Sequence, residues 1–133
     1  MSQAPADTIK DLYAAFGRGD IPAILEMVDE DVDWRVPENL PHGGTFAGRD
    51  AVGGFFQGIG EAWEGLQLDL EDMVSDDTHV VATAHIHGRL RSSGEEAGYR
   101  SAHMWTVENG VPTRFAEYVH APVGLPAAHA AAA

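Results

Sequence analysis

The sequence predicts an α+β fold in which helices pack on one face of an antiparallel sheet. Apolar residues recur at helical spacing in the first half of the chain, interrupted by one short strand pattern. From about residue 66 onward they recur at every second position, which is the period of a strand. Because the strands come mostly in one C-terminal block, the early helices cannot each connect two parallel strands.

Length and composition indicate one globular domain. The 133 residues fit a single domain over residues 1–125, followed by a flexible, alanine-rich tail at 126–133. The absence of cysteine excludes a disulfide framework, a cysteine-ligated zinc or iron–sulfur site and a thiol nucleophile.

Charge and hydropathy narrow the partners. A formal net charge of −13 disfavours nucleic acid and anionic membranes as partners. No apolar run approaches the roughly 18 residues of a membrane span, and residues 1–8 lack the basic and apolar parts of a signal peptide. We therefore expect a cytoplasmic protein that binds neither nucleic acid nor membrane.

Three helices are predicted. The first ends at Gly17, with Asp7 and Thr8 as capping candidates, and its apolar face comprises Ile9, Leu12, Tyr13 and Phe16. A short second helix is predicted after Asp20, which is a suitable cap. Pro22 fits the first turn of this helix. The third starts at Asp50, and its apolar face comprises Val52, Phe55, Phe56, Ile59 and Trp63.

Five strands are predicted around these helices. The first, 32–36, alternates apolar and polar residues and ends at Pro37, where a loop over 37–48 begins. The others start near Leu66 or cover about 79–91, 98–107 and 113–120. The dipeptide Asn109-Gly110 predicts a tight hairpin before the last strand.

The strand faces gather titratable side chains. His85 and His87 share one face of their strand because they are two residues apart. Consecutive hairpins could bring this pair beside His103 and Glu117, although the pattern leaves open whether all four faces point the same way. A solvent-facing histidine pair and an exposed edge glutamate are the alternatives, and the pattern assigns no role to His42.

Four groups of motifs follow one another along the chain: Tyr13-Ala-Ala-Phe16 with Gly19-Asp20, Asp31-Val-Asp-Trp34, Gly48-Arg-Asp-Ala-Val52 with Phe55-Phe56, and Trp105-Thr-Val-Glu-Asn-Gly110 with Glu117-Tyr-Val119. Together they resemble the SnoaL-like group of the nuclear transport factor two-like superfamily over about residues 8–120. The resemblance implies a cone-shaped fold, in which a strongly curved, mostly antiparallel sheet wraps around three N-terminal helices and encloses a pocket. It also implies a homodimer through the outer face of the sheet.

The resemblance further implies which residues face the pocket, and it argues against one reaction. The catalytic aspartate of ketosteroid isomerase falls on Val36 and its oxyanion-binding tyrosine on Leu12, so steroid isomerisation by that mechanism is not expected. The predicted substrate-binding residues are Tyr13, Phe16, Trp34, Val36, Phe55, Phe56, Trp63, Trp105, Phe115 and Val119.

The favoured function is that of a cofactor-free general acid/base enzyme of the polyketide cyclase, dehydratase or isomerase type. It would act on a bulky apolar carbonyl compound, with His103 and Glu117 transferring the proton and His85 or His87 assisting. The alternatives are a non-catalytic module that binds small molecules and, less favoured, a metal site built on His85, His87 and His103.

Overall fold

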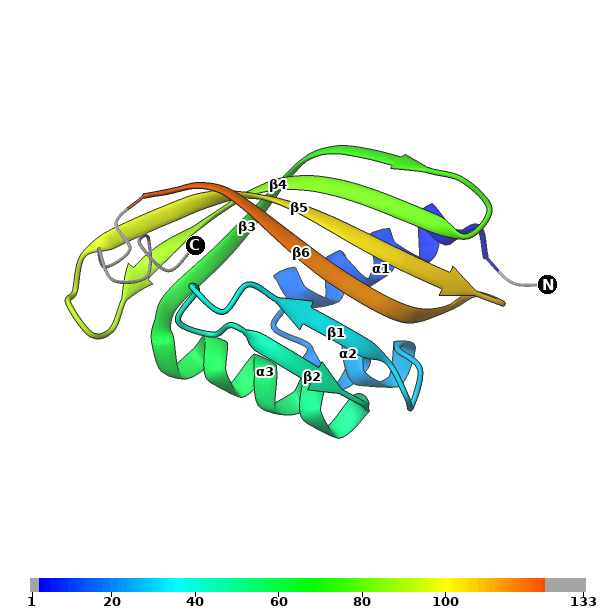
Figure 1. Ribbon diagram of the computed structural model, residues 1–133, viewed down its shortest axis with the longest axis horizontal. Coiled ribbons are helices and arrows are strands. Elements are labelled where there is room, and N and C mark those ends of the chain that lie inside the picture. The colour runs from blue at the N-terminus through cyan, green and yellow to red at the C-terminus, as the bar shows by residue number, and fades with distance from the viewer. Residues whose placement is uncertain (1–2, 124–133) are drawn as a thin grey trace.

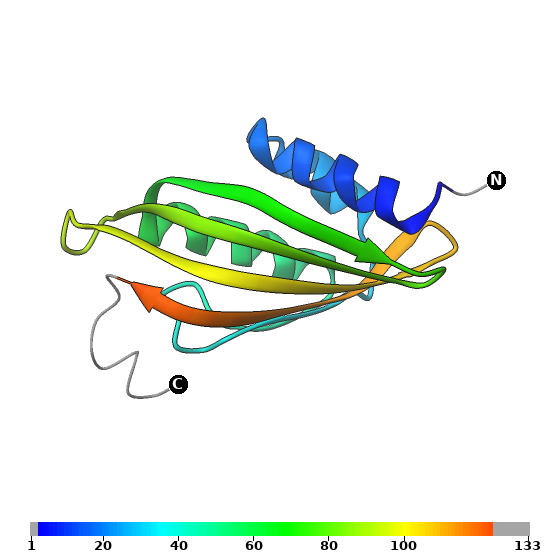
Figure 2. The same cartoon turned by 90° about the horizontal axis from the view of Figure 1, so that it is seen from above.

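Four long strands arch over three helices in the computed structural model, which describes residues 3–123 (Figures 1 and 2). The helices are α1 (Pro5–Gly17), α2 (Ile21–Met27) and α3 (Arg49–Ala62). The strands are β1 (Asp33–Val36), β2 (Gly44–Ala47), β3 (Trp63–Ser75), β4 (His79–Leu90), β5 (Glu96–Glu108) and β6 (Val111–Val123). The predicted α+β class is confirmed, whereas the predicted tail at 126–133 lies outside the described residues.

One six-stranded sheet runs in the order β2-β1-β6-β5-β4-β3. Every neighbouring pair is antiparallel except β1 and β6, which run parallel and bring Trp34 opposite Phe115. The hairpin before β6 is confirmed, because Asn109 and Gly110 both adopt positive φ angles of 53° and 78°. The sheet is thus mixed and open, and it curves around the helices.

The helix ends partly follow the sequence signals. Asp20 caps α2 as predicted, since its side chain accepts a hydrogen bond from the Ala23 amide at 3.2 Å. The predicted start of α1 is wrong, because the helix begins at Pro5, ahead of Asp7 and Thr8. Proline suits a first helical position, where its missing amide proton costs nothing.

Two boundaries near α3 also correct the prediction. The predicted loop 37–48 contains β2, which pairs with β1 from Gly44 to Ala47. Trp63 belongs to β3 and not to the helix, since its φ and ψ angles are −125° and 146°. A four-residue strand is too short to show a period, and the change from helix to strand at Trp63 lacks an intervening turn.

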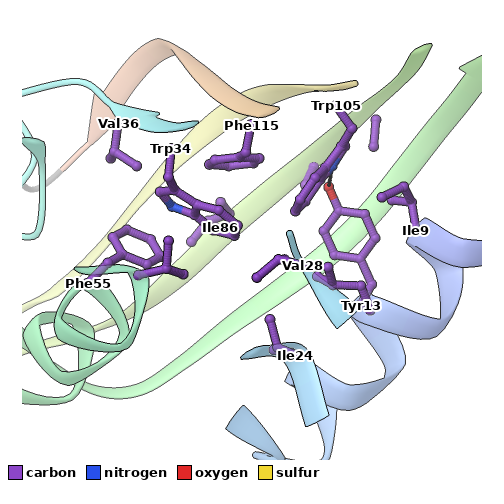
Figure 3. Close-up of a cluster of buried hydrophobic side chains, with 14 of the residues drawn as sticks. Ile9, Tyr13, Ile24, Val28, Trp34, Val36, Phe55, Ile86, Trp105 and Phe115 are labelled. Carbon is purple, nitrogen blue, oxygen red and sulfur yellow. Dashed lines mark hydrogen bonds between the residues drawn. The ribbon is translucent and has the colours of Figure 1, made fainter. Parts of the chain in front are cut away.

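The core between helices and sheet is rich in aromatic rings, with Trp34, Phe55, Trp105 and Phe115 all buried (Figure 3). Trp34 packs against both the sheet and α3, because its ring centroid lies 4.2 Å from that of Phe115 on β6 and 5.4 Å from that of Phe55 on α3. Within residues 3–123, no helix has both the length and the apolar character needed to cross a membrane.

Candidate active site

A buried histidine–glutamate pair joins β5 to β6. His103 and Glu117 are direct partners in the antiparallel register. His103 Nε2 lies 2.9 Å from Glu117 Oε2, and the two side chains are only 5% and 4% exposed. Ser101 Oγ donates a second hydrogen bond to the same carboxylate oxygen at 2.6 Å. The predicted contact between His103 and Glu117 is therefore present.

A tyrosine from α1 extends this pair toward the helices. Tyr13 Oη lies 2.6 Å from His103 Nδ1, and Trp105 Nε1 donates to the same Oη at 3.0 Å (Figure 3 shows the Trp105–Tyr13 contact). An indole N–H can only donate, so the hydroxyl proton of Tyr13 is free to go to His103 Nδ1. His103 then carries its proton on Nε2 and donates it to Glu117.

Burial and hydrogen bonding act against each other on Glu117. Burial alone would raise its pKa, but the hydrogen bond and charge of His103, the hydrogen bond of Ser101 and the charge of His42 together lower it below the usual value. Glu117 is therefore a carboxylate at neutral pH. Burial raises the pKa of Tyr13, against the Trp105 hydrogen bond and together with the charge of Glu117, so Tyr13 keeps its proton.

A second buried histidine comes from the turn before β2. Trp63 Nε1 donates to His42 Nδ1 at 3.0 Å, and His42 Nε2 lies 3.3 Å from Tyr99 Oη. Because Nδ1 accepts, neutral His42 carries its proton on Nε2 and can donate to Tyr99. Burial lowers the pKa of His42 despite the attraction of Glu117, which favours this neutral form.

The two histidine networks border one cavity of about 60 Å³ between α1, α3 and the inner face of the sheet. Its wall is mostly apolar and includes Leu12, Ile24, Ile59, Leu66, Leu68 and Ile86. Ligand sites usually enclose about 300–1,000 Å³, so the cavity must widen to admit a bulky ligand. Phe16 and Phe56, half-buried with centroids 6.2 Å apart, are the lining aromatics best placed to move.

Seven of the ten predicted substrate-binding residues line this cavity: Tyr13, Phe16, Trp34, Phe55, Phe56, Trp105 and Phe115. The other three do not. Val36 is buried in the core, Trp63 holds His42, and Val119 is half-buried beyond Glu117, opposite Ser101.

The predicted position of His85 and His87 beside His103 is wrong. The register pairs His103 with Ala82, whereas His85 faces Arg100 and His87 faces Gly98. The two histidines thus lie on the outer face of the sheet, away from the cavity. This placement also rules out a metal site that combines them with His103.

Three polar residues of the site were not predicted: His42, Ser101 and Tyr99. Ser101 and Tyr99 could have been found, because they alternate with His103 along β5. His42 lies in a turn with no periodic pattern, so the sequence offers no signal for its direction.

One buried donor that borders the cavity has no hydrogen-bond partner among the described residues. Among residues 3–123, the Nε1 atom of Trp34 makes no hydrogen bond, although Trp34 is 2% exposed and lines the cavity. Buried polar groups are rarely left unpaired. This indole N–H is available to an acceptor atom that enters the cavity.

Comparison with known proteins identifies the family of the chain. The model of the SnoaL-like domain family matches residues 9–117, a span that contains every residue of the two networks. The chain belongs to the SnoaL-like domain family. An uncharacterized protein of Mycobacterium tuberculosis is 31% identical over 121 residues, which cover 90% of this chain and 91% of that protein.

Solved structures share the fold of this SnoaL-like protein. An NTF2-like protein of Burkholderia thailandensis has a TM-score of 0.84 and 25% identity over 89% of this chain and 92% of its own. TerC, co-crystallized with polyporic acid, has a TM-score of 0.77 and 27% identity over 87% and 91%. A proposed polyketide cyclase of Xanthomonas campestris has a TM-score of 0.71 and 26% identity over 87% and 90%.

Proposed function

We propose that the protein is a general acid/base enzyme that moves a proton next to the carbonyl group of an apolar small molecule. The observation that carries the proposal is the buried 2.9 Å contact between His103 and Glu117 at an aromatic cavity. Similarity to a proposed polyketide cyclase supports the same class, and similarity to TerC, which was co-crystallized with polyporic acid, supports a small-molecule ligand. Cyclisation, dehydration and isomerisation all contain such a proton transfer, and the step needs no cofactor.

Glu117 acts as the base in this proposal. Its Oε2 atom already accepts hydrogen bonds from His103 and Ser101. Within the described residues no donor contacts Oε1, which leaves that oxygen free to take a proton from carbon. The lowered pKa of Glu117 keeps it ionised, and the bound donors hold its orientation.

Tyr13 supplies the hydrogen bond to the substrate oxygen. When His103 is protonated on both nitrogens, Nε2 still donates to Glu117 and Nδ1 donates to Tyr13 Oη, so the tyrosine proton is free for a carbonyl oxygen. Negative charge that develops on this oxygen is stabilised by the hydrogen bond. Glu117 afterwards returns its proton to a carbon or oxygen of the product, so no net proton is gained or lost.

The walls favour a flat ring system. Trp34, Phe55 and Phe115 offer ring faces and edges to a ligand between α3 and the sheet. A bulky substrate requires Phe16 and Phe56 to move apart, so we expect Phe16→Ala to improve the binding of larger ketones.

Deuterium exchange tests the proposal without knowledge of the substrate. The protein is incubated in D₂O with a panel of cyclic ketones and 1,3-diketones, and deuterium uptake next to the carbonyl is followed by NMR. We expect catalysed exchange for at least one compound. Glu117→Gln should slow it by about 10²-fold or more, the usual share of a general acid/base group.

His79→Gln is the matched control, because His79 is an exposed histidine of β4 that lies outside the cavity lining. It should leave exchange unchanged. Binding of a ketone with no exchange above the rate in buffer would reject catalysis and favour a non-catalytic binding module. Equal exchange by Glu117→Gln and the wild type would reject the assigned base.

A further inference from the structure

We infer that the outer face of the sheet carries a binding site for a divalent transition metal ion, formed by Asp69, His85 and His87. The site faces away from the cavity and does not depend on the proposed function. Its ligand atoms come from two paired strands, β3 and β4, and all lie within 4.8 Å of one another.

The register of β3 and β4 brings the three side chains together. His85 and His87 are two residues apart on β4, so both imidazoles project from the same face, and their rings stack with centroids 5.0 Å apart. Asp69 is the direct partner of His85 across the strand pair. Its Oδ2 atom also lies 2.8 Å from His87 Nε2.

These distances suit a shared ion. Zinc bonds to imidazole nitrogen and carboxylate oxygen measure about 2.0–2.2 Å in tetrahedral geometry, so two ligand atoms of one ion lie about 3.3–3.6 Å apart. Rotation of the partly exposed side chains brings the more distant ligand atoms together and opens the 2.8 Å contact between Asp69 and His87. An ion would replace the direct Asp69–His87 hydrogen bond and hold both groups.

A glycine on the next strand keeps the site open. Gly98 of β5 is the partner of His87, and a Cβ atom added there would lie 3.2 Å from His85 Nε2 and 3.4 Å from His87 Cβ. A side chain at position 98 would therefore crowd the imidazole of His85 and the Cβ atom of His87. With glycine, His85, His87 and Gly98 line a hollow on the surface.

The ligand set determines the class of ion. Two imidazoles and one carboxylate suit zinc, cobalt, nickel or iron(II), whereas calcium and magnesium prefer oxygen ligands alone. Arg100, the nearest cross-strand cation, is paired with Glu71 at 2.6 Å and 2.7 Å. The net charge of −13 adds a general attraction for cations.

Metal titration of the full-length protein tests the inference. Zinc chloride is titrated by calorimetry, and cobalt(II) chloride is followed by its visible absorption, which reports the ligand geometry. We expect one site per chain with nitrogen ligation. His85→Gln, His87→Gln and Asp69→Asn should each weaken binding by at least tenfold, while thermal unfolding of the metal-free variants changes little.

Two further variants distinguish a specific metal site from nonspecific binding at a surface histidine. His79 also lies on β4 beside an aspartate, with its Nδ1 atom 3.4 Å from Asp76, but it lacks a second histidine. His79→Gln should leave the affinity unchanged, and Gly98→Val should weaken it although all three ligands remain. The absence of binding by the wild type, or equal loss in His79→Gln and His87→Gln, would overturn the inference.

Discussion

Trp34 and Trp105 are neighbouring buried indoles, with centroids 5.4 Å apart, whose N–H groups differ in hydrogen bonding. Trp105 donates to Tyr13, whereas Trp34 has no acceptor among the described residues. An unpaired buried donor costs about 1–3 kcal/mol, and a hydrogen bond that is made contributes about 0.5–1.5 kcal/mol. The same substitution should therefore change the free energy of unfolding by different amounts at the two positions.

We expect Trp105→Phe to lower the free energy of unfolding by at least about 1 kcal/mol more than Trp34→Phe. Both substitutions remove the same volume from positions that are 1% and 2% exposed. Only Trp105→Phe breaks a hydrogen bond, while Trp34→Phe removes an unpaired donor. Urea denaturation measures both values, and an equal or reversed order would show that the Trp34 N–H is satisfied in solution.

Single residues also mark how far the sequence could predict the site. The period of two is enough to place His103 with Tyr99 and Trp105 on one face of β5, and Glu117 with Phe115 on one face of β6. Which face of β4 lies beside the His103 face of β5 depends on the register between the two strands. No residue pattern in β4 specifies that register.

At the scale of elements, the turn 37–43 between β1 and β2 places His42 against Trp63 and Tyr99. Two backbone hydrogen bonds close this turn, from Leu40 N to Pro37 O at 3.1 Å and from Gly43 N to Leu40 O at 3.0 Å. The chain passes so close to itself that a Cβ atom on Gly43 would lie 1.9 Å from Pro37 O. Only glycine fits there without movement of the backbone.

Gly43→Ala should therefore destabilise the protein by about 1–3 kcal/mol, the usual cost of overpacking. Gly54→Ala is the matched control, since Gly54 is an exposed residue of α3 whose added Cβ would meet nothing within 4 Å. Alanine is the better helix former, so this control should stabilise by about 0.5–1 kcal/mol. Chemical denaturation compares the two, and a neutral Gly43→Ala would show that the turn can shift freely.

The elements explain why part of the fold escaped prediction. Long amphipathic segments such as α1 and β4 carry enough repeats to reveal their period. β2 spans only four residues and starts with Gly44, and the preceding turn contains Pro37, Pro41 and Gly43. The whole segment therefore has the composition of a turn, which gives no indication of a strand. The parallel pairing of β1 with β6 joins segments far apart in the chain, which no local pattern specifies.

At the scale of the whole molecule, the net charge and the buried Glu117 have opposite effects on the stability of the fold as the pH falls. The net charge of −13 makes the folded chain repel itself, and acid relieves this repulsion. The buried pair acts in the opposite direction, because the folded-state pKa of Glu117 is lowered from its usual value of about 4.5. The ionised carboxylate thus stabilises the fold above about pH 4.5, and this contribution is lost as the pH falls through the folded-state pKa.

Comparison of two glutamine variants separates these effects. At pH 7 we expect Glu117→Gln to lower the free energy of unfolding by about 1–3 kcal/mol, since a neutral amide weakens the contacts with His103 and Ser101. Below pH 4.5 the wild type loses the stabilisation from ionised Glu117. The difference in free energy of unfolding between the wild type and Glu117→Gln should therefore narrow. Glu108→Gln, at an exposed glutamate at the end of β5, changes the net charge equally and should keep a small, constant difference. Urea denaturation between pH 3.5 and pH 7 measures both differences, and a difference for Glu117→Gln that stays constant would mean that the pKa of Glu117 is the same in the folded and unfolded protein, against the lowered folded-state value.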